Sequence, residues 1–270
     1  MTAPRLRILS LGAGVQSTTL ALMAARGEIE APDCALFADT GWEPRAVYEH
    51  LNRLEAALPF PVLRVCAGDL RADIIRGNSD RSGRLASVPW FLKNPDGSAA
   101  MGRRQCTAHY KLEPMARKIR ELLGATRRGR VHGFAEIQIG ISTDEASRMK
   151  PARVGYMRNR WPLIEREMSR NDCMNWLARA GWAAPKSSCI GCPFHNNAQW
   201  RDLRDNDPDA WTDAVAIDRL IRKGGHVRGI RGEQFMHRSL VPLDEVDLRT
   251  AEDRGQLNMF NNECEGMCGV

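Results

Sequence analysis

The chain has 270 residues, of which 43% are hydrophobic and 27% are charged. These values are ordinary for a globular protein, and they exclude a collagen, a coiled coil and wholesale disorder. No stretch approaches the roughly 18 apolar residues that a membrane span needs. No apolar segment with a cleavage site opens the sequence either. We therefore expect no membrane segment and a cytoplasmic location.

A small excess of basic residues, 39 Lys and Arg against 33 Asp and Glu, gives the chain a net charge of +6. This balance favours polyanionic ligands such as nucleotides or nucleic acid, although a moderate excess of Arg is also common on soluble surfaces. The eight cysteines are not expected to form disulfides, because thiols in the cytoplasm stay reduced. Each cysteine is therefore a candidate metal or cluster ligand, a nucleophile or a small core residue.

The N-terminal quarter of the chain alternates apolar runs with amphipathic segments. In chain order, strands are predicted over residues 5–11, 33–39 and 61–66, and helices over 17–25 and 45–58. The second helix carries its apolar residues on one face, as Val47, Leu51, Leu54 and Leu58. This alternation is typical of a parallel sheet covered by helices. Ligands of such sheets bind at the carboxyl ends of the strands, so the residues that follow each strand are the first candidates for a site.

The rest of the chain carries a weaker pattern. Residues 78–104 are rich in Gly, Pro, Ser, Asp and Asn and lack periodicity, which predicts a long loop. Beyond it we predict a helix over 114–123, a strand within 131–142 that ends at Gly140, and helices over 169–180 and 209–222. Ser169 is a good N-cap, with Asp172 at the third helical position. We expect two units: a nucleotide-binding domain at 1–150 and a smaller helical, cysteine-bearing region at 151–270.

The loop after the first strand, residues 10–19, reads SLGAGVQSTT. Between a strand and a helix, backbone N–H groups and the helix dipole form an anion site. Gly12 and Gly14 would let the backbone approach a phosphate, and Ser17 and Thr18 add hydroxyl donors. The loop matches neither a Walker loop nor the dinucleotide fingerprint, and a tight turn alone would also explain its glycines.

The second strand ends in Asp39-Thr40-Gly41. In a parallel sheet this places a carboxylate and a hydroxyl beside the first loop. Together the two strand ends resemble the adenine nucleotide alpha-hydrolase (PP-loop) superfamily, whose loop reads SGGxDS. They are most similar to its phosphoadenosine phosphosulfate reductase-like branch, whose second strand ends in DTG.

Three later segments also resemble that branch. Residues 139–148 (IGISTDEASR) are similar to its G-x-R-x-x-E-S-x-R element, residues 161–164 (WPLI) with the next helix to its P-L-x-x-W-T-x-x-D-V stretch, and residues 186–193 (KSSCIGCP) to its late cysteine pair. The resemblance implies an α/β protein with a parallel, Rossmann-like sheet. It also implies a site for ATP or another adenine nucleotide, with Mg²⁺ as a further cofactor. The residues it assigns to nucleotide binding are Ser10, Gly12, Gly14, Gln16, Ser17, Thr18, Asp39, Thr40, Gly41, Lys111, Glu145 and Arg148.

The sequence departs from the family pattern at four positions. Gly12 replaces the first Ser of the loop, Val15 the frequent Lys, and Gln16 the Asp. That Asp is implicated in metal and pyrophosphate handling in members that split ATP, so Gln16 counts against ATP cleavage. Ser142 stands where the family often has an Arg, which leaves Lys111 and Arg148 as the candidate cationic contacts.

Three cysteines are candidate ligands of one inorganic group. Cys189 and Cys192 form a CxxC pair, which zinc, an iron–sulfur cluster or a redox dithiol would each explain. Cys106 lies in RRQCTAHYKLEP, which resembles the family element C-C-x-x-x-K-x-x-P that supplies cluster ligands. On this resemblance we expect a 4Fe-4S cluster with one iron free of protein thiolate. The alternative is zinc, with His195 as the fourth ligand.

The remaining cysteines have other expected roles. Cys264 and Cys268, in the terminal NECEGMCGV, each match part of the Glu-Cys-Gly-Leu-His tail of sulfonucleotide reductases, which carries a nucleophilic cysteine. We expect them to be catalytic, although a fourth cluster ligand or an incidental tail residue fits the same pattern. The other three are predicted to be small core residues: Cys34, Cys66 and Cys173.

These observations favour an iron–sulfur-dependent sulfur-transfer enzyme that binds an adenine nucleotide and thiolates a nucleic acid such as tRNA or DNA, with a separate sulfur donor. The first alternative is a sulfonucleotide reductase that acts on adenylyl sulfate or phosphoadenylyl sulfate with thioredoxin. The second is a non-catalytic nucleotide- or nucleic-acid-binding module with structural zinc. The sequence does not indicate an oligomeric state.

Overall fold

The computed structural model of the chain describes residues 3–77, 88–126, 129–222, 232–250 and 252–255. Its strands are β1 (Leu6–Ser10), β2 (Cys34–Asp39), β3 (Val62–Cys66), β4 (Phe91–Lys93), β5 (Ala99–Met101), β6 (Ala135–Ile139), β7 (Met157–Arg160) and β8 (Glu233–Phe235). Its α-helices are α1 (Val15–Ala25), α2 (Arg45–Ala57), α3 (Leu70–Arg76), α4 (Glu113–Leu122), α5 (Pro162–Glu165), α6 (Arg170–Arg179), α7 (Asn197–Asn206) and α8 (Pro208–Ile221).

A five-stranded parallel sheet forms the centre of the molecule, with the strand order β3-β2-β1-β6-β7. This confirms the predicted α/β class. β1 lies between β2 and β6, with Ile8 paired to Cys34 on one side and to Ile137 on the other. From β1 the chain builds β2 and β3 on one side and then crosses to β6 on the other. A crevice forms at the carboxyl ends of strands where the order reverses in this way, and it is the usual ligand site of open α/β sheets.

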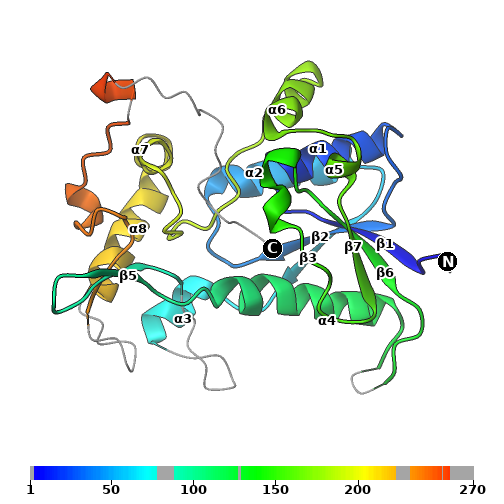
Figure 1. Cartoon of the computed structure of the whole chain (residues 1–270), viewed down its shortest axis with the longest axis horizontal. Coiled ribbons are helices and arrows are strands. Elements are labelled where there is room, and N and C mark those ends of the chain that lie inside the picture. The colour runs from blue at the N-terminus through cyan, green and yellow to red at the C-terminus, as the bar shows by residue number, and fades with distance from the viewer. Residues whose placement is uncertain (1–2, 78–87, 127–128, 223–231, 251, 256–270) are drawn as a thin grey trace.

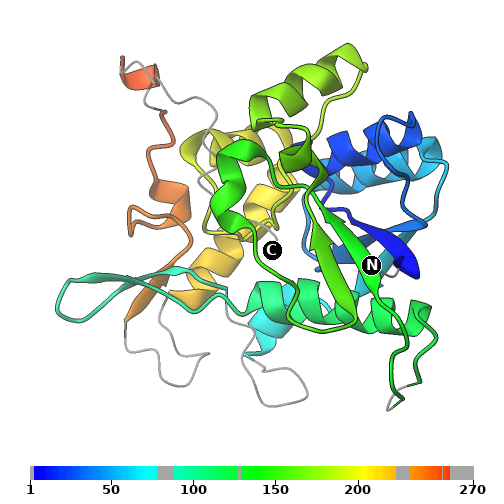
Figure 2. The same cartoon turned by 45° about the vertical axis from the view of Figure 1, so that its right-hand side comes forward.

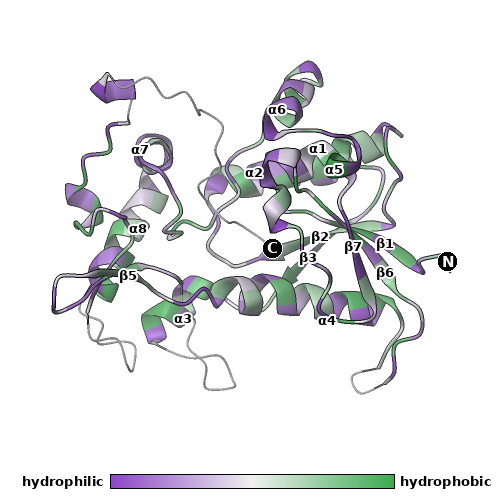
Figure 3. Ribbon diagram, in the orientation of Figure 1, coloured by the Kyte–Doolittle hydropathy of each residue, from purple (hydrophilic) through white to green (hydrophobic). Residues whose placement is uncertain are grey.

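Helices cover both faces of the sheet (Figures 1 and 2). On one face Leu9 packs in a cluster with residues of α1, α2 and α6; on the other Ile8 packs with residues of α4. Successive residues of a strand point to opposite faces, which is why one strand supplies both layers. Ten of the eleven residues of α1 are buried, and Figure 3 shows this helix hydrophobic over most of its length.

A third hydrophobic cluster lies beside the sheet, around the fully buried Trp200 of α7. It joins α7 and α8 to a small antiparallel sheet of order β5-β4-β8. The predicted loop over 78–104 is therefore wrong in part, since β4 and β5 form a hairpin inside it, while residues 78–87 lie outside the described ranges. These three-residue strands depend on pairing with β8, a partner about 140 residues further on that no local pattern indicates.

The other predicted elements agree with the structure to within a few residues. α6 begins after Ser169, whose side chain accepts from the Asp172 N–H as a capping box. The last strand of the parallel sheet, β7, pairs with β6 but follows residue 150; the division into 1–150 and 151–270 stays a prediction. No helix in the described ranges is long and apolar enough to cross a membrane.

His50 of α2 contacts Thr18 of α1 and so links these two helices. Its Nε2 lies 2.9 Å from Thr18 Oγ1, and its ring meets the edge of Trp182. Burial, with a smaller contribution from Arg53, lowers the pKa of His50 to about 4, so the ring is neutral at pH 7.

A pH dependence of stability follows from this shift. The unfolded chain gains a proton at His50 near pH 6.5 and the folded chain only near pH 4. Folding is therefore destabilised as the pH falls between these values, by up to about 3 kcal/mol. We expect His50→Gln, which keeps a polar group near Thr18 but does not titrate, to reduce the loss of unfolding free energy, measured with urea, between pH 6.5 and pH 4. The exposed His132→Gln is the control; equal slopes for both variants would contradict the account.

Candidate functional site

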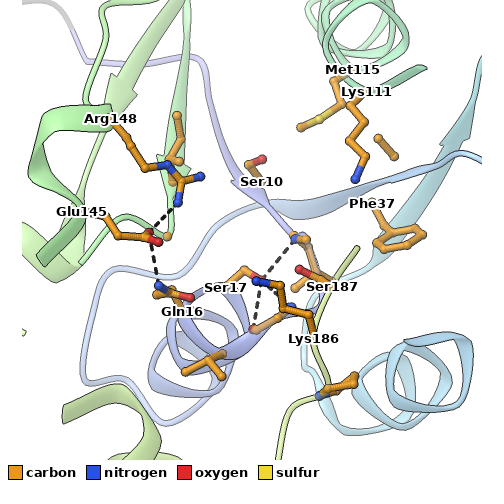
Figure 4. Close-up of a pocket in the computed structure, with 18 of the residues that line it drawn as sticks. Ser10, Gln16, Ser17, Phe37, Lys111, Met115, Glu145, Arg148, Lys186 and Ser187 are labelled. Carbon is orange, nitrogen blue, oxygen red and sulfur yellow. Dashed lines mark hydrogen bonds and ion pairs between the residues drawn. The ribbon is translucent and has the colours of Figure 1, made fainter. Parts of the chain in front are cut away.

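A cleft of about 1030 Å³, part of it open to solvent, lies at the carboxyl ends of β1 and β6 (Figure 4). It lies at the point where the strand order reverses. Eight of the twelve residues predicted to bind the nucleotide line it: Ser10, Gly12, Gly14, Gln16, Ser17, Lys111, Glu145 and Arg148. The structure therefore brings together residues from the first loop, from the segment before α4 and from the turn after β6.

The first loop forms the floor of this cleft. The N–H groups of Gly12 and Gly14 both donate to Ser17 Oγ, at 3.2 and 3.3 Å. Two N–H groups that converge on one oxygen at a helix N-terminus are also the arrangement that holds a phosphate oxygen. Gly14 is required for a close approach, since a Cβ there would lie 2.6 Å from Ser187 Oγ.

The buried Gln16 side chain is a polar part of the surface at one end of the cleft. Its Nε2 donates to Glu145 Oε2 at 3.2 Å, and its Oε1 accepts from Arg170 Nη1 at 3.1 Å. Glu145 also pairs with Arg148 at 2.7 Å. An Asp at position 16 could not donate to Glu145 and would place a second carboxylate beside it. The neutral amide is therefore matched to Glu145, which gives a physical reason for the departure from the family motif.

Charge in the cleft favours an anionic ligand. Four basic side chains and two carboxylates line it: Lys111, Arg148, Arg170, Lys186, Glu43 and Glu145. The N-terminus of α1, which faces the same space, adds a partial positive charge. This excess of positive charge attracts phosphate or sulfate groups.

Four of the predicted nucleotide-binding residues do not line the cleft. Thr18 points to the far side of α1, where its hydroxyl contacts His50. The Asp39 carboxylate accepts from the Gly41 N–H and the Tyr48 hydroxyl, both at 2.8 Å. Thr40 donates to Glu43 and lies 3.3 Å from Cys189 Sγ. The Asp-Thr-Gly turn therefore contacts Cys189 through Thr40 and does not line the cleft.

Sequence reasoning missed several residues of the cleft. Phe37 and Met115 supply its apolar surface, and Glu43, Arg170 and Lys186 supply charge. Two of them have a signal in retrospect, because Glu43 follows the Asp-Thr-Gly motif and Lys186 precedes the CxxC pair. Arg170 begins a helix, and only the fold shows that this helix end meets Gln16.

A second pocket, of about 460 Å³ and part of it open, adjoins the cleft. Cys106, Cys189 and Cys192 all line it, although Cys106 lies more than 80 residues before the other two in the sequence. Lys111 lines both this pocket and the cleft. At its rim the Arg104 guanidinium lies 5.7 Å from the centre of the Phe194 ring. We refer to this space as the cysteine pocket.

Burial raises the pKa of the Cys106 and Cys189 thiols, and the neighbouring Lys111 opposes both shifts. Metal ligation requires the thiolate form, so a bound metal would displace these protons. In the described part of the chain no three His, Cys, Asp or Glu side chains are close enough to share one metal ion. A zinc ion needs its ligands gathered about a single point. In a cubane cluster each thiolate binds a different iron. The cluster expected for Cys106, Cys189 and Cys192 stays a prediction.

His195, the proposed fourth zinc ligand, belongs to a different environment. Its Nε2 lies 2.6 Å from Ser188 Oγ, and the residue lines a third pocket between α2 and α7 rather than the cysteine pocket. Burial lowers the pKa of its imidazole to about 3. His195 and the three cysteines therefore line different pockets.

The other cysteines divide in two groups. Cys34 and Cys173 are buried as predicted, and burial raises the pKa of their thiols to about 11 and about 12. The core prediction for Cys66 is wrong, because the residue is exposed at the end of the edge strand β3. Cys264 and Cys268 lie outside the described residues.

No family model matches the chain, and no curated protein matches it either. Among solved structures it is similar to the phosphoadenylyl-sulfate (PAPS) reductase from Candida auris, crystallised as a phosphate complex. The TM-score is 0.44 and the identity 13%, over 68% of this chain and 76% of that one. The α/β assignment rests on the strand order described above.

Basic residues of the cleft are expected to control nucleotide affinity. Arg148→Ala and Lys186→Ala each remove a charged donor, and we expect each to weaken binding of adenosine diphosphate about tenfold by calorimetry. The exposed Arg153, which does not line the cleft, gives the matched control Arg153→Ala with wild-type affinity. Wild-type affinity in both cleft variants would show that the nucleotide binds elsewhere.

Proposed function

We propose that the chain is a sulfur-transfer enzyme that binds an adenine nucleotide in the cleft and an iron–sulfur cluster in the cysteine pocket. The observation that supports this most directly is the contact between the two spaces. Lys111 lines both, and residues 185–187 line the cleft while Cys189 and Cys192 line the pocket. Glu43 connects them as well, since it lines the cleft and accepts from Cys189 Sγ at 3.4 Å.

Each part of the cleft has a role in this proposal. The amides of the first loop would bind phosphate at the N-terminus of α1, and Lys111 and Lys186 would neutralise its charge. Phe37 and Met115 offer an apolar surface for the adenine ring. Mg²⁺ would bind together with the phosphates of ATP. The two carboxylates of the cleft, Glu43 and Glu145, are already paired with basic side chains, so they would not bind the ion by themselves.

Cys106, Cys189 and Cys192 would hold the cluster, which supplies an iron without a protein thiolate as a binding point for sulfide. Around these ligands the chain provides charge and hydrogen bonds. Thr40 and Glu43 contact Cys189, and Lys111 places a positive charge between the nucleotide and the thiols. This arrangement keeps the phosphates of the nucleotide next to the sulfur chemistry.

The proposed acceptor is a nucleic acid, tRNA or DNA, which the basic balance of the chain favours. ATP would adenylate an oxygen of the acceptor and release pyrophosphate. Sulfide from a donor would then displace AMP and leave the acceptor with sulfur in place of that oxygen. The chain's part in these steps is to bind the nucleotide and to exclude bulk water from the reacting groups.

A second candidate is a sulfonucleotide reductase, which the neutral Gln16 favours because this chemistry splits no pyrophosphate bond. Cys264 or Cys268 would attack the sulfur of a bound adenylyl sulfate, with AMP or its 3′-phosphate as the leaving group. Thioredoxin would reduce the resulting S-sulfocysteine, releasing sulfite and becoming a disulfide. Whichever of the two cysteines attacks would have to reach the cleft.

The transfer proposal is tested by nucleoside analysis of a strain that lacks the gene. We expect loss of a thio-modified nucleoside, restored by the wild-type gene and by the control Cys66→Ala, whose residue is exposed and outside both spaces. Cys192→Ala should not restore it, because the pocket loses a ligand. An unchanged nucleoside profile in the deletion strain would contradict transfer to nucleic acid. Thioredoxin-dependent sulfite release that is lost on truncation after Asn262 would establish the reductase instead.

A further inference from the structure

The backbone between Cys189 and Cys192 is held by two tryptophans from separate parts of the chain. The Ile190 N–H donates to the Trp42 carbonyl at 2.8 Å, and the Gly191 carbonyl accepts from the Trp90 indole Nε1–H at 3.0 Å. The Cys192 N–H closes the turn on the Cys189 carbonyl at 3.0 Å. Each residue between the two cysteines therefore makes one hydrogen bond to a tryptophan.

The Trp42 ring also restricts the turn by contact. A Cβ at Gly191 would lie 2.1 Å from Trp42 Cη2 and 2.4 Å from Cζ3, so only glycine fits at this position. Trp42 and Trp90 are 3% and 4% exposed, and Trp42 lines the cysteine pocket. The turn is therefore packed against one ring and hydrogen-bonded to the other away from solvent.

Both tryptophans are anchored in the region beside the sheet. The Trp42 indole N–H donates to Asp213 of α8 at 2.7 Å, and Arg71 of α3 donates to the same carboxylate at 2.6 Å. Trp90 directly precedes β4, which pairs with β5 and β8. The position of the turn is thus set by α3, α8 and the small sheet, none of which contributes a cysteine.

We infer that Trp90 is a positioning residue, whose indole N–H fixes the Gly191 carbonyl and, together with Trp42, sets the separation of the Cys189 and Cys192 sulfurs before any metal binds. The assignment of these sulfurs as cluster ligands rests on the proposed function. The preorganised turn does not depend on the proposed function, because every contact that forms it is made by the protein alone. Without the indole N–H the buried Gly191 carbonyl loses its donor, and the turn gains freedom to rotate. Preorganised ligands bind more tightly because less order is lost on binding.

The test compares Trp90→Phe, which keeps an aromatic ring but removes the donor, with Trp211→Phe. Trp211 packs in the same hydrophobic cluster as Trp90, whereas the bond to the Gly191 carbonyl comes from Trp90. In the reduced, metal-free chain the probe is phenylarsine oxide, which bridges two nearby thiols; the binding lost in Cys189→Ser is assigned to this pair. We expect Trp90→Phe to weaken that binding about three- to tenfold, the effect of one buried hydrogen bond. Trp211→Phe should keep wild-type affinity.

A second measurement needs no variant. In the wild-type metal-free chain, hydrogen exchange of the peptide containing Ile190 should be slowed, because its N–H is bonded to Trp42 before metal binds. Exchange as fast as in a free peptide, or equal arsenical affinity in Trp90→Phe and Trp211→Phe, would overturn the inference.

The two proposals fail separately in these experiments. If anaerobic reconstitution gives no cluster but Trp90→Phe still weakens arsenical binding, the positioning role is supported and the cluster proposal is contradicted. If the cluster forms and Trp90→Phe changes neither the arsenical affinity nor the cluster's midpoint potential, the cluster proposal is supported and the positioning role is contradicted.

Discussion

The site depends on one topological constraint, the reversal of strand order beside β1. Parallel strands need crossover connections, and the chain builds β2 and β3 to one side of β1 before it crosses to β6 on the other. The loops after β1 and β6 therefore leave the sheet in opposite directions and open a crevice between them. Gly12, Gly14 and Ser17 occupy one side of this crevice, and Glu145 and Arg148 the other. The cleft is thus a consequence of connectivity, and the side chains then determine which ligands it accepts.

The segment from Pro185 to Cys192 joins this crevice to the rest of the molecule. Pro185 and Lys186 line the cleft, and Cys189 and Cys192 line the cysteine pocket together with Trp42 and with Leu70 of α3. The carboxyl end of β2 contacts the same segment through Thr40 and Glu43. A ligand in the cleft and a group in the cysteine pocket would therefore share the same supporting residues. Electrostatic influence of one on the other follows directly, because Lys111 faces both.

Sequence patterns predicted the parallel sheet and the glycine-rich loop of the cleft because those signals are local. Alternating apolar runs indicate strands and helices, and glycines after a strand indicate an anion site. The hairpin β4–β5 was not predicted because β4 pairs with β8, which lies far away in the sequence. The contact of Arg170 with Gln16 also depends on the fold alone. The gathering of Cys106 with the CxxC pair was expected only from the resemblance to family motifs. Cys66 was misplaced because a strand end carries no sign of whether it lies at a sheet edge.

The central claim is that Cys106, Cys189 and Cys192 together hold an iron–sulfur cluster beside a nucleotide cleft. Anaerobic purification, followed by an absorbance spectrum with iron, sulfide and zinc quantified, tests it most directly. The account predicts a brown protein with about four irons and four sulfides per chain. A colourless protein that carries one zinc would contradict it and would leave a nucleotide-binding module with a structural metal.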